Sequence, residues 1–320
     1  MKGIAVAGSM LADKIYEIEN YPKSGELAKI LNISLAAGGC VPNVATDIKT
    51  VCPEIPVYAF GRAGRDGDGK FIEDCLSRAG VDTSNIVYCN QPTSFTAVMS
   101  IRGGQRTFFT YAGASADFCA DDVNLDTCDI GMLHLGYFLL LDKIDGGDGL
   151  KLLKRARKRG IKTSVDLVSE NSPRYAAVRP CLKYVDNLII NEFEAAYLAG
   201  ADPSAPLYGV AEKLKELGVS ERVIIHRPDV SVCLSERGFT SLGSYELPAG
   251  FIKGTTGAGD AFCAGALIGI YGNADDKSIL EFASAAAVSS LSAADAVSGM
   301  RRRDEVEKLC KNFKRRNICL

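Results

Sequence analysis

The chain has 320 residues, of which 47% are hydrophobic, and its formal net charge is −2. This length can bury a sizeable core, and the composition predicts a soluble globular protein. Without a broad basic field, nucleic acid is not an expected partner, and no apolar run reaches the roughly 18 residues of a membrane span. The 11 cysteines include no C-x-x-C pair, so we expect free thiols in a cytoplasmic protein and no zinc site.

The first predicted element is a buried apolar strand at residues 4–7, which ends in a turn before Asp13. A lone acidic residue after a strand is a turn or capping residue as readily as a ligand. Residues 15–19 alternate apolar and polar side chains, and residues 27–35 can return beside them as a second strand. Because this pair lies outside the βα rhythm that follows, we assign residues 12–35 to a small lid.

Gly38 and Gly39 open the next predicted helix, and Asn43 lies on its first turn. A side-chain amide can donate to and accept from sugar hydroxyls, although close backbone packing explains the glycines equally well. Further along, residues 93–111 predict a β-hairpin that turns at residues 103–104 and has one apolar and one polar face. We assign this hairpin to the same lid.

After residue 130, strands and helices alternate, which predicts an α/β fold with a parallel sheet. Asp166 lies at the carboxyl end of one strand, and that end faces the ligand crevice in open α/β sheets. The strand at residues 188–190 leads into Asn191 and Glu194. These two residues lie at i and i+3 on the first turn of a helix, where an N-terminal cap is the simplest interpretation.

The most informative stretch is residues 254–262, Gly-Thr-Thr-Gly-Ala-Gly-Asp-Ala-Phe, which leads into an apolar helix. After Gly257, the N–H groups of Ala258, Gly259 and Asp260 can converge on an anion at this helix start. Asp260 stands where a phosphate-binding loop would need lysine. We therefore predict that Asp260 is a general base and that the amides hold the charge of a transferred phosphoryl group. A glycine turn capped by Asp260 is the alternative, and local chemistry does not separate the two.

This stretch, extended to Leu267, resembles the C-terminal signature of the ribokinase-like (PfkB) carbohydrate kinases, which favours the general-base interpretation. The other candidate residues follow in the family's motif order over nearly the whole chain. The resemblance implies a three-layer α/β/α sandwich with a small β-sheet lid, in which residues 1–320 form a single kinase domain. It also implies ATP-dependent phosphorylation of a sugar-like hydroxyl.

The same resemblance assigns roles to individual residues. It implies that the substrate is bound by Asp13, Gly38, Gly39 and Asn43. It implies that the nucleotide is contacted by Asn191, Glu194, His226, Thr256, Gly259 and Ser284. Mg²⁺ would be held by Glu194 and Asn191 through water, because magnesium prefers hard oxygen ligands and keeps most of its waters.

Two departures from the family pattern bear on these expectations. Gly254 replaces an Asp that is a ligand in members activated by a monovalent cation, so potassium dependence stays open. Residues 226–231 lack two glycines of a loop that lies along the nucleotide, which leaves room for an unusual nucleotide or for a sugar-binding sensor without turnover. The motifs do not separate monosaccharides (ribose, fructose or keto-deoxy sugar acids) from nucleosides.

Four further expectations remain. The family and the exposed edges of the lid predict a homodimer formed through the lid. Residues 301–316 predict a charged, exposed C-terminal helix. We expect His134, in an apolar strand, to be structural, and Arg106, in the predicted hairpin, to be solvated.

Overall fold

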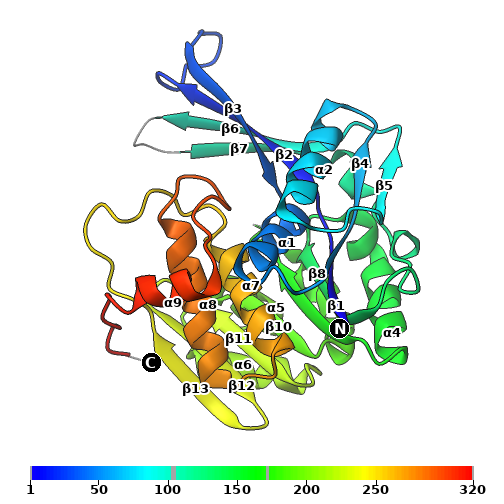
Figure 1. Cartoon of the computed structure of the whole chain (residues 1–320), viewed down its shortest axis with the longest axis vertical. Coiled ribbons are helices and arrows are strands. Elements are labelled where there is room, and N and C mark those ends of the chain that lie inside the picture. The colour runs from blue at the N-terminus through cyan, green and yellow to red at the C-terminus, as the bar shows by residue number, and fades with distance from the viewer. Residues whose placement is uncertain (1, 102–105, 171–172, 319–320) are drawn as a thin grey trace.

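The computed structural model describes residues 2–101, 106–170 and 173–318 and confirms a ribokinase-like α/β sandwich with a second, smaller sheet (Figure 1). Within these residues the large sheet runs in the order β13 (Gly238–Gly243), β12 (Val230–Ser235), β11 (Arg222–His226), β10 (Asn187–Asn191), β9 (Lys162–Leu167), β8 (Ile130–Phe138), β1 (Gly3–Ala7), β4 (Val57–Gly64) and β5 (Ile86–Cys89). The strands from β11 to β5 are parallel, and β12 and β13 are antiparallel at one edge.

Helices cover both faces of this sheet because its strands are apolar on both sides. In β1, Ile4 and Val6 belong to one buried cluster, whereas Ala5 and Ala7 belong to the other. The first cluster is covered by α1 (Cys40–Val51), α2 (Gly67–Ala79), α7 (Ala258–Tyr271), α8 (Asp276–Leu291) and α9 (Arg303–Cys310). The second is covered by η2 (Ile144–Asp148), α4 (Gly149–Lys158), η3 (Pro173–Tyr184), α5 (Glu192–Ala199) and α6 (Leu207–Glu216). Two further short helices, α3 (Gly113–Ala116) and η1 (Ala120–Asp122), lie between β7 (Arg106–Tyr111) and β8 in the sequence.

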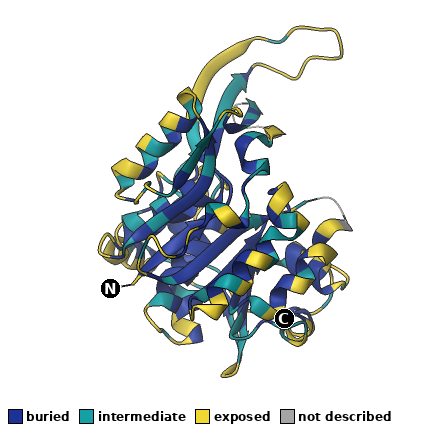
Figure 2. Cartoon of the chain, turned by 90° about the vertical axis from the view of Figure 1, so that its right-hand side faces the viewer, coloured by how far each residue is buried: buried dark blue, intermediate teal, exposed yellow. Residues whose placement is uncertain are grey.

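The small sheet stands away from the body of the molecule, and its far end is largely exposed (Figure 2). Its strand order is β3 (Ile30–Gly38), β2 (Leu11–Ile18), β6 (Ser94–Ile101) and β7 (Arg106–Tyr111). β2 and β6 are parallel, and the two outer strands run antiparallel to their neighbours. These strands come from the two segments assigned to a lid, and the predicted turn at residues 103–104 lies outside the described residues.

The small sheet has two faces of different chemistry. Its inner face lines a cavity and consists of Asp13, Ile15, Glu17, Asn32, Ser34, Val98, Ser100, Arg106 and Phe108. Alternate residues form its outer face, which includes Tyr16, Leu31, Ile33, Leu35, Phe95, Met99, Phe109 and Tyr111. Ile33 is 65% exposed and Phe109 is 59% exposed, so this part of the outer face is an apolar surface open to solvent, whereas Lys14 on the same face pairs with Asp68 of α2.

The C-terminal helix is shorter than expected, so its predicted length is wrong, although most of residues 301–316 are exposed as expected. α9 ends at Cys310, and residues 311–318 turn back toward the end of β13. There Arg315 lies 4.0 Å over the ring of Tyr245 and donates a 2.8 Å hydrogen bond to its hydroxyl. Val306 is buried, so α9 packs one face on the protein core. In the described residues, no helix has the length and apolar character needed to cross a bilayer.

Candidate active site

The candidate residues meet at the carboxyl ends of the central strands, below the small sheet. Asn191 ends β10, Asp166 lies near the end of β9, and Tyr137 lies near the end of β8. Asn43 and Asp260 come from the first turns of α1 and α7, which pack against each other. In a parallel sheet all these ends share one edge, which is why residues distant in sequence come together here.

Asp260 is the third residue of α7 and is 6% exposed. Its Oδ2 accepts a 2.9 Å hydrogen bond from Asn43 Nδ2 and a 3.0 Å hydrogen bond from the Tyr137 hydroxyl. Burial, and secondarily the charge of Asp166, raise the pKa of Asp260 to about 7. A carboxyl group with this pKa can take up a proton near neutral pH, as a general base requires.

The helix start before Asp260 has the shape that the glycines predicted. Gly257 has a φ of 81°, and a Cβ there would lie 2.6 Å from the carbonyl oxygen of Ala296, so only glycine fits. The Ala258 amide donates to Thr255 O at 3.3 Å within the loop. The Gly259 and Asp260 amides are at the second and third helical positions, where α-helical geometry provides no acceptor. These two amides are therefore the better donors to an anion.

Asp13, Gly38 and Gly39 form a second group at the base of the small sheet. A Cβ at Gly38 would overlap the Asp13 carboxylate, and a Cβ at Gly39 would lie 2.7 Å from Ser9 O. The glycines therefore make room for Asp13 and for the chain, and neither lines the cavity of the inner face. That cavity has a volume of about 440 Å³. Burial raises the pKa of Asp13, which lines it, to about 6.

Asn43 links this group to Asp260. Its Nδ2 is used by Asp260, whereas its Oδ1 is buried without a hydrogen-bond partner among the described residues. A buried acceptor without a donor costs free energy, so a hydroxyl supplied by a ligand would stabilise it. This acceptor is the type of group that was predicted at position 43.

Asn191 and Glu194 form the N-terminal cap of α5 and also face the site. Asn191 Oδ1 accepts from the Glu194 amide at 2.9 Å, and Glu194 Oε2 accepts from the Asn191 amide at 3.0 Å. Ser169 Oγ donates to Glu194 Oε1 at 2.8 Å. Burial raises the pKa of Glu194 to about 7. The structural interpretation of this pair is thus confirmed, and it does not exclude ligand binding.

Glu194 and Asn191 share a cavity of about 280 Å³ with Asp166, Asp260 and Gly259. Its lining offers carboxylate and amide oxygens, which are the hard ligands that Mg²⁺ prefers. The donor set therefore fits magnesium beside the first turn of α7.

A larger cavity of about 520 Å³ adjoins the first turn of α7. His226 and Ser284 line it together with mostly apolar side chains, and Gly259 lies at its edge. The His226 ring lies 4.6 Å from the ring of Phe262, and burial lowers the pKa of His226 to about 4. His226 is therefore neutral at physiological pH. Such an apolar cavity beside an anion-binding helix start can accept a flat ring with a phosphate chain.

The structure places two residues differently from the sequence expectations. Thr256 lines the cavity of the inner face together with Asp13. Its Oγ1 accepts a 3.0 Å hydrogen bond from Arg106 Nη1, so Arg106, which is exposed as expected, also contacts the glycine-rich loop. Tyr137, the second donor to Asp260, was not predicted. Its only sequence signal is its place at the carboxyl end of a strand.

Comparisons with known proteins agree with this geometry. The family described as pfkB family carbohydrate kinase matches residues 1–302. A ribokinase of Arabidopsis thaliana is 28% identical over 96% of this chain and 81% of its own length, and an adenosine kinase of Saccharomyces cerevisiae is 27% identical over 77% and 74%. The solved structure of Arabidopsis thaliana ribokinase complexed with ribose and ATP is similar, with a TM-score of 0.82, 26% identity and coverage of 97% of this chain and 99% of that one.

Proposed function

The chain belongs to the pfkB family of carbohydrate kinases and is a phosphotransferase with an alcohol group as acceptor, and from this premise we propose that it transfers the γ-phosphoryl group of ATP to a hydroxyl of a neutral monosaccharide. The observation that carries this proposal is the buried Asp260, held by Asn43 and Tyr137 at the start of α7. It lies in a cavity next to the proposed nucleotide site. Asn43 connects it to the base of the small sheet, because its side chain donates to Asp260 and its backbone amide donates to Gly39 O.

In the proposed reaction Asp260 takes the proton of the attacking hydroxyl. Both of its observed hydrogen bonds end on Oδ2, so Oδ1 is the oxygen that can accept this proton. As the proton moves to Asp260, the substrate oxygen forms a bond to the γ-phosphorus. The bond from that phosphorus to the β,γ-bridging oxygen breaks, and ADP leaves. The raised pKa of Asp260 suits this role, because a base with a pKa near 7 is both ionised and sufficiently basic at neutral pH.

The first turn of α7 would stabilise the charge that develops on the phosphoryl group. Gly259 and Asp260 supply backbone amides at the positive end of the helix. Bound Mg²⁺ would neutralise phosphate charge, and Asp166, Asn191 and Glu194 supply the oxygens that would hold it, directly or through water.

The inner face of the small sheet favours an uncharged substrate. Asp13, Glu17 and Asp295 line its cavity with carboxyl groups. The guanidinium of Arg106 also lines this cavity and donates a hydrogen bond to Thr256. Carboxylates repel an anionic ligand and accept hydrogen bonds from hydroxyl groups. A neutral sugar is therefore favoured over a keto-deoxy sugar acid.

A nucleoside kinase of the same fold is the second candidate. Its support is the similarity to the yeast adenosine kinase, together with Phe108 and Val98, which give the inner face an apolar portion that a base could contact. A sugar-binding sensor without turnover is the third candidate, motivated by the altered loop at residues 226–231. The intact start of α7 argues against it.

One assay separates these candidates. The full-length protein with ATP and Mg²⁺ is tested for ADP release on ribose, fructose, a keto-deoxy sugar acid and adenosine, and each product is identified by mass spectrometry. Turnover of a neutral sugar supports the proposal. Preferred turnover of adenosine supports the nucleoside kinase. Thermal stabilisation by a sugar without any ATP consumption would show a sensor and refute the proposed reaction.

A further inference from the structure

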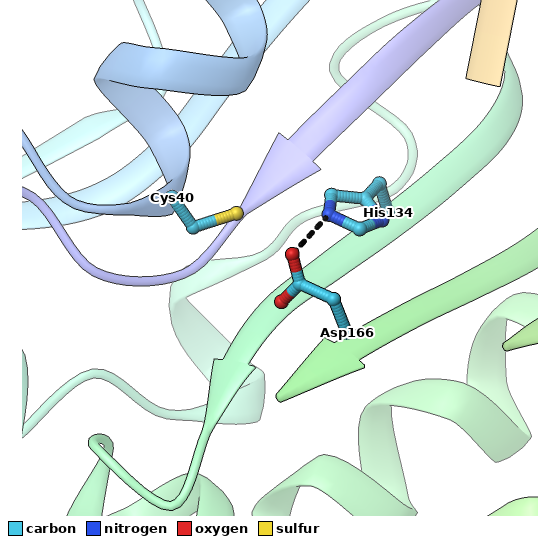
Figure 3. Close-up of side chains that lie close together, drawn as sticks. All are labelled: Cys40, His134 and Asp166. Carbon is cyan, nitrogen blue, oxygen red and sulfur yellow. Dashed lines mark ion pairs between the residues drawn. The ribbon is translucent and has the colours of Figure 1, made fainter. Parts of the chain in front are cut away.

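Three buried side chains of different chemistry converge behind the candidate active site. Cys40 is the first residue of α1, His134 lies in β8, and Asp166 lies near the end of β9. One ligand atom from each residue lies within 4.8 Å of the other two, and Figure 3 shows the three side chains pointing toward one another. Cys40 and His134 have no exposed surface, and Asp166 is 7% exposed. A thiol, an imidazole and a carboxylate are the ligand types that zinc accepts.

The distances around His134 match the edges of a tetrahedral zinc site. Usual zinc–ligand bond lengths at tetrahedral angles place an imidazole nitrogen about 3.4 Å from a carboxylate oxygen and about 3.6 Å from a sulfur. His134 Nε2 lies 3.5 Å from Asp166 Oδ2 and 3.6 Å from Cys263 Sγ. The imidazole and the Asp166 carboxylate are therefore already spaced as they would be in a zinc complex, whereas Cys263 lies outside the group of three ligand atoms.

Neighbouring groups hold these side chains in place. A Cβ at Gly136 would overlap the sulfur of Cys40 and would lie 3.0 Å from Asp166 Oδ1, so both groups occupy the space that this glycine leaves open. His134 Nδ1 lies 3.2 Å from Ser164 Oγ. A metal-binding histidine usually donates from its second nitrogen to such a partner, which fixes the ring and leaves the first nitrogen free for the metal.

We propose that Cys40, His134 and Asp166 form a binding site for Zn²⁺ or a chemically similar divalent transition metal, with the fourth position taken by water. Asp166 and Cys263 line the cavity of about 280 Å³ that also reaches Asp260, so an ion can approach from the active-site cleft. This site shares Asp166 with the proposed magnesium position, but its sulfur and nitrogen ligands select a softer metal. The sequence contains no zinc motif because the ligands come from separate segments of the chain.

Burial raises the pKa of the Cys40 thiol, and the nearby charges of Asp166 and Asp260 raise it further. Without a metal the group is therefore a neutral thiol. Metal binding must release its proton, so metal affinity falls as the pH is lowered.

Cobalt serves as the spectroscopic probe in the test. The full-length protein is freed of metal with a chelator and titrated with Co²⁺. We expect one Co²⁺ per chain, with the visible bands of tetrahedral cobalt and a thiolate charge-transfer band, both removed by added Zn²⁺. Ser164→Ala removes the hydroxyl that holds the second nitrogen of His134 and should weaken binding by roughly 10–100-fold, and Cys40→Ser or His134→Asn should weaken it further. Cys181→Ser is the control, because Cys181 is a buried thiol on the opposite face of the large sheet and should leave the bands unchanged.

A second measurement needs no variant and therefore stands if Cys40→Ser fails to fold. X-ray absorption of the zinc-loaded wild-type protein should show one sulfur neighbour at about 2.3 Å together with nitrogen or oxygen neighbours. A shell without sulfur, the absence of saturable binding, or a cobalt thiolate band that persists in folded Cys40→Ser would overturn the proposal. None of these readouts depends on kinase activity, so they also stand if the proposed reaction fails.

Discussion

Replacing Asp260 with asparagine should reduce activity and raise stability at the same time. Asparagine has nearly the same shape, and its carbonyl oxygen can accept the hydrogen bonds that Asn43 and Tyr137 now donate to Oδ2. It cannot take a proton from a hydroxyl. We therefore expect kcat to fall by about 10²–10⁴-fold, the usual contribution of a general base.

The stability change follows from the burial of the carboxyl group. The pKa of Asp260 is raised from 3.8 to about 7, so the folded protein binds this proton more tightly than the unfolded chain does. The carboxyl group therefore lowers the free energy of unfolding as the pH rises through this range, and the full loss is present above pH 7. At about 1.4 kcal/mol for each tenfold change in proton affinity, the upper limit is about 4 kcal/mol. Asp260→Asn removes this penalty, so the variant should gain stability at pH 8 and change little at pH 4.

The assay combines steady-state ADP release with denaturant unfolding at both pH values. Asp276→Asn is the matched control, because Asp276 is also buried but pairs with Arg222 at 2.9 Å, away from the cleft. It should lose stability and keep its kcat. An Asp260→Asn variant whose kcat stays within a few-fold of wild type would refute the general-base role. A variant that is less stable than wild type at pH 8 would refute the reasoning about burial.

Three other outcomes test separate parts of the structure. Tyr137→Phe removes a hydrogen bond to the Asp260 carboxylate that is worth about 1.5–3 kcal/mol, so the pKa of Asp260 should rise by about one to two units. The pH profile of kcat/KM should then move to higher pH, and an unmoved profile would contradict the contact. His226→Ala removes a ring that lines the proposed nucleotide cavity. If the ring of the nucleotide base packs on His226, a contact worth about 0.5–1.5 kcal/mol is lost, so KM for ATP should rise by up to about tenfold with kcat little changed. A lower kcat at constant KM would argue against this placement. Wild-type protein should be a dimer by light scattering. The double variant Ile33→Asp, Phe109→Asp, which changes the exposed outer face, should be a monomer. A monomeric wild type would refute the prediction of a homodimer through this sheet.

Local sequence patterns predicted the parts of the site that lie on single helix starts. Asp260 and its glycines lie within four consecutive residues, and Asn191 and Glu194 lie three positions apart, so their spacing alone places them on one helical turn. The alternation on the strands likewise predicted the two faces of the hairpin. These features depend on short-range geometry, which the order of residues determines directly.

Contacts between distant segments could not be predicted in this way. Tyr137 reaches Asp260, and Arg106 reaches Thr256, only because the fold brings separate elements together. Tyr137 also has a φ of 60°, which sequence alone would not suggest for a bulky residue. The C-terminal helix was predicted too long because its charges gave no sign of the Arg315 contact that draws the chain back toward β13.

The division of the small sheet into two faces limits how its strands can change in length. Every second residue on these strands points toward the cavity, and the residues between them form the apolar surface on the other side. With the pairing of residues 35–38 kept, adding one residue between Ser34 and Leu35 would turn Leu31 and Ile33 toward the cavity and Asn32 and Ser34 toward the outside. Natural variants of this protein should therefore differ in these strands by even numbers of residues, or compensate an odd change with a bulge.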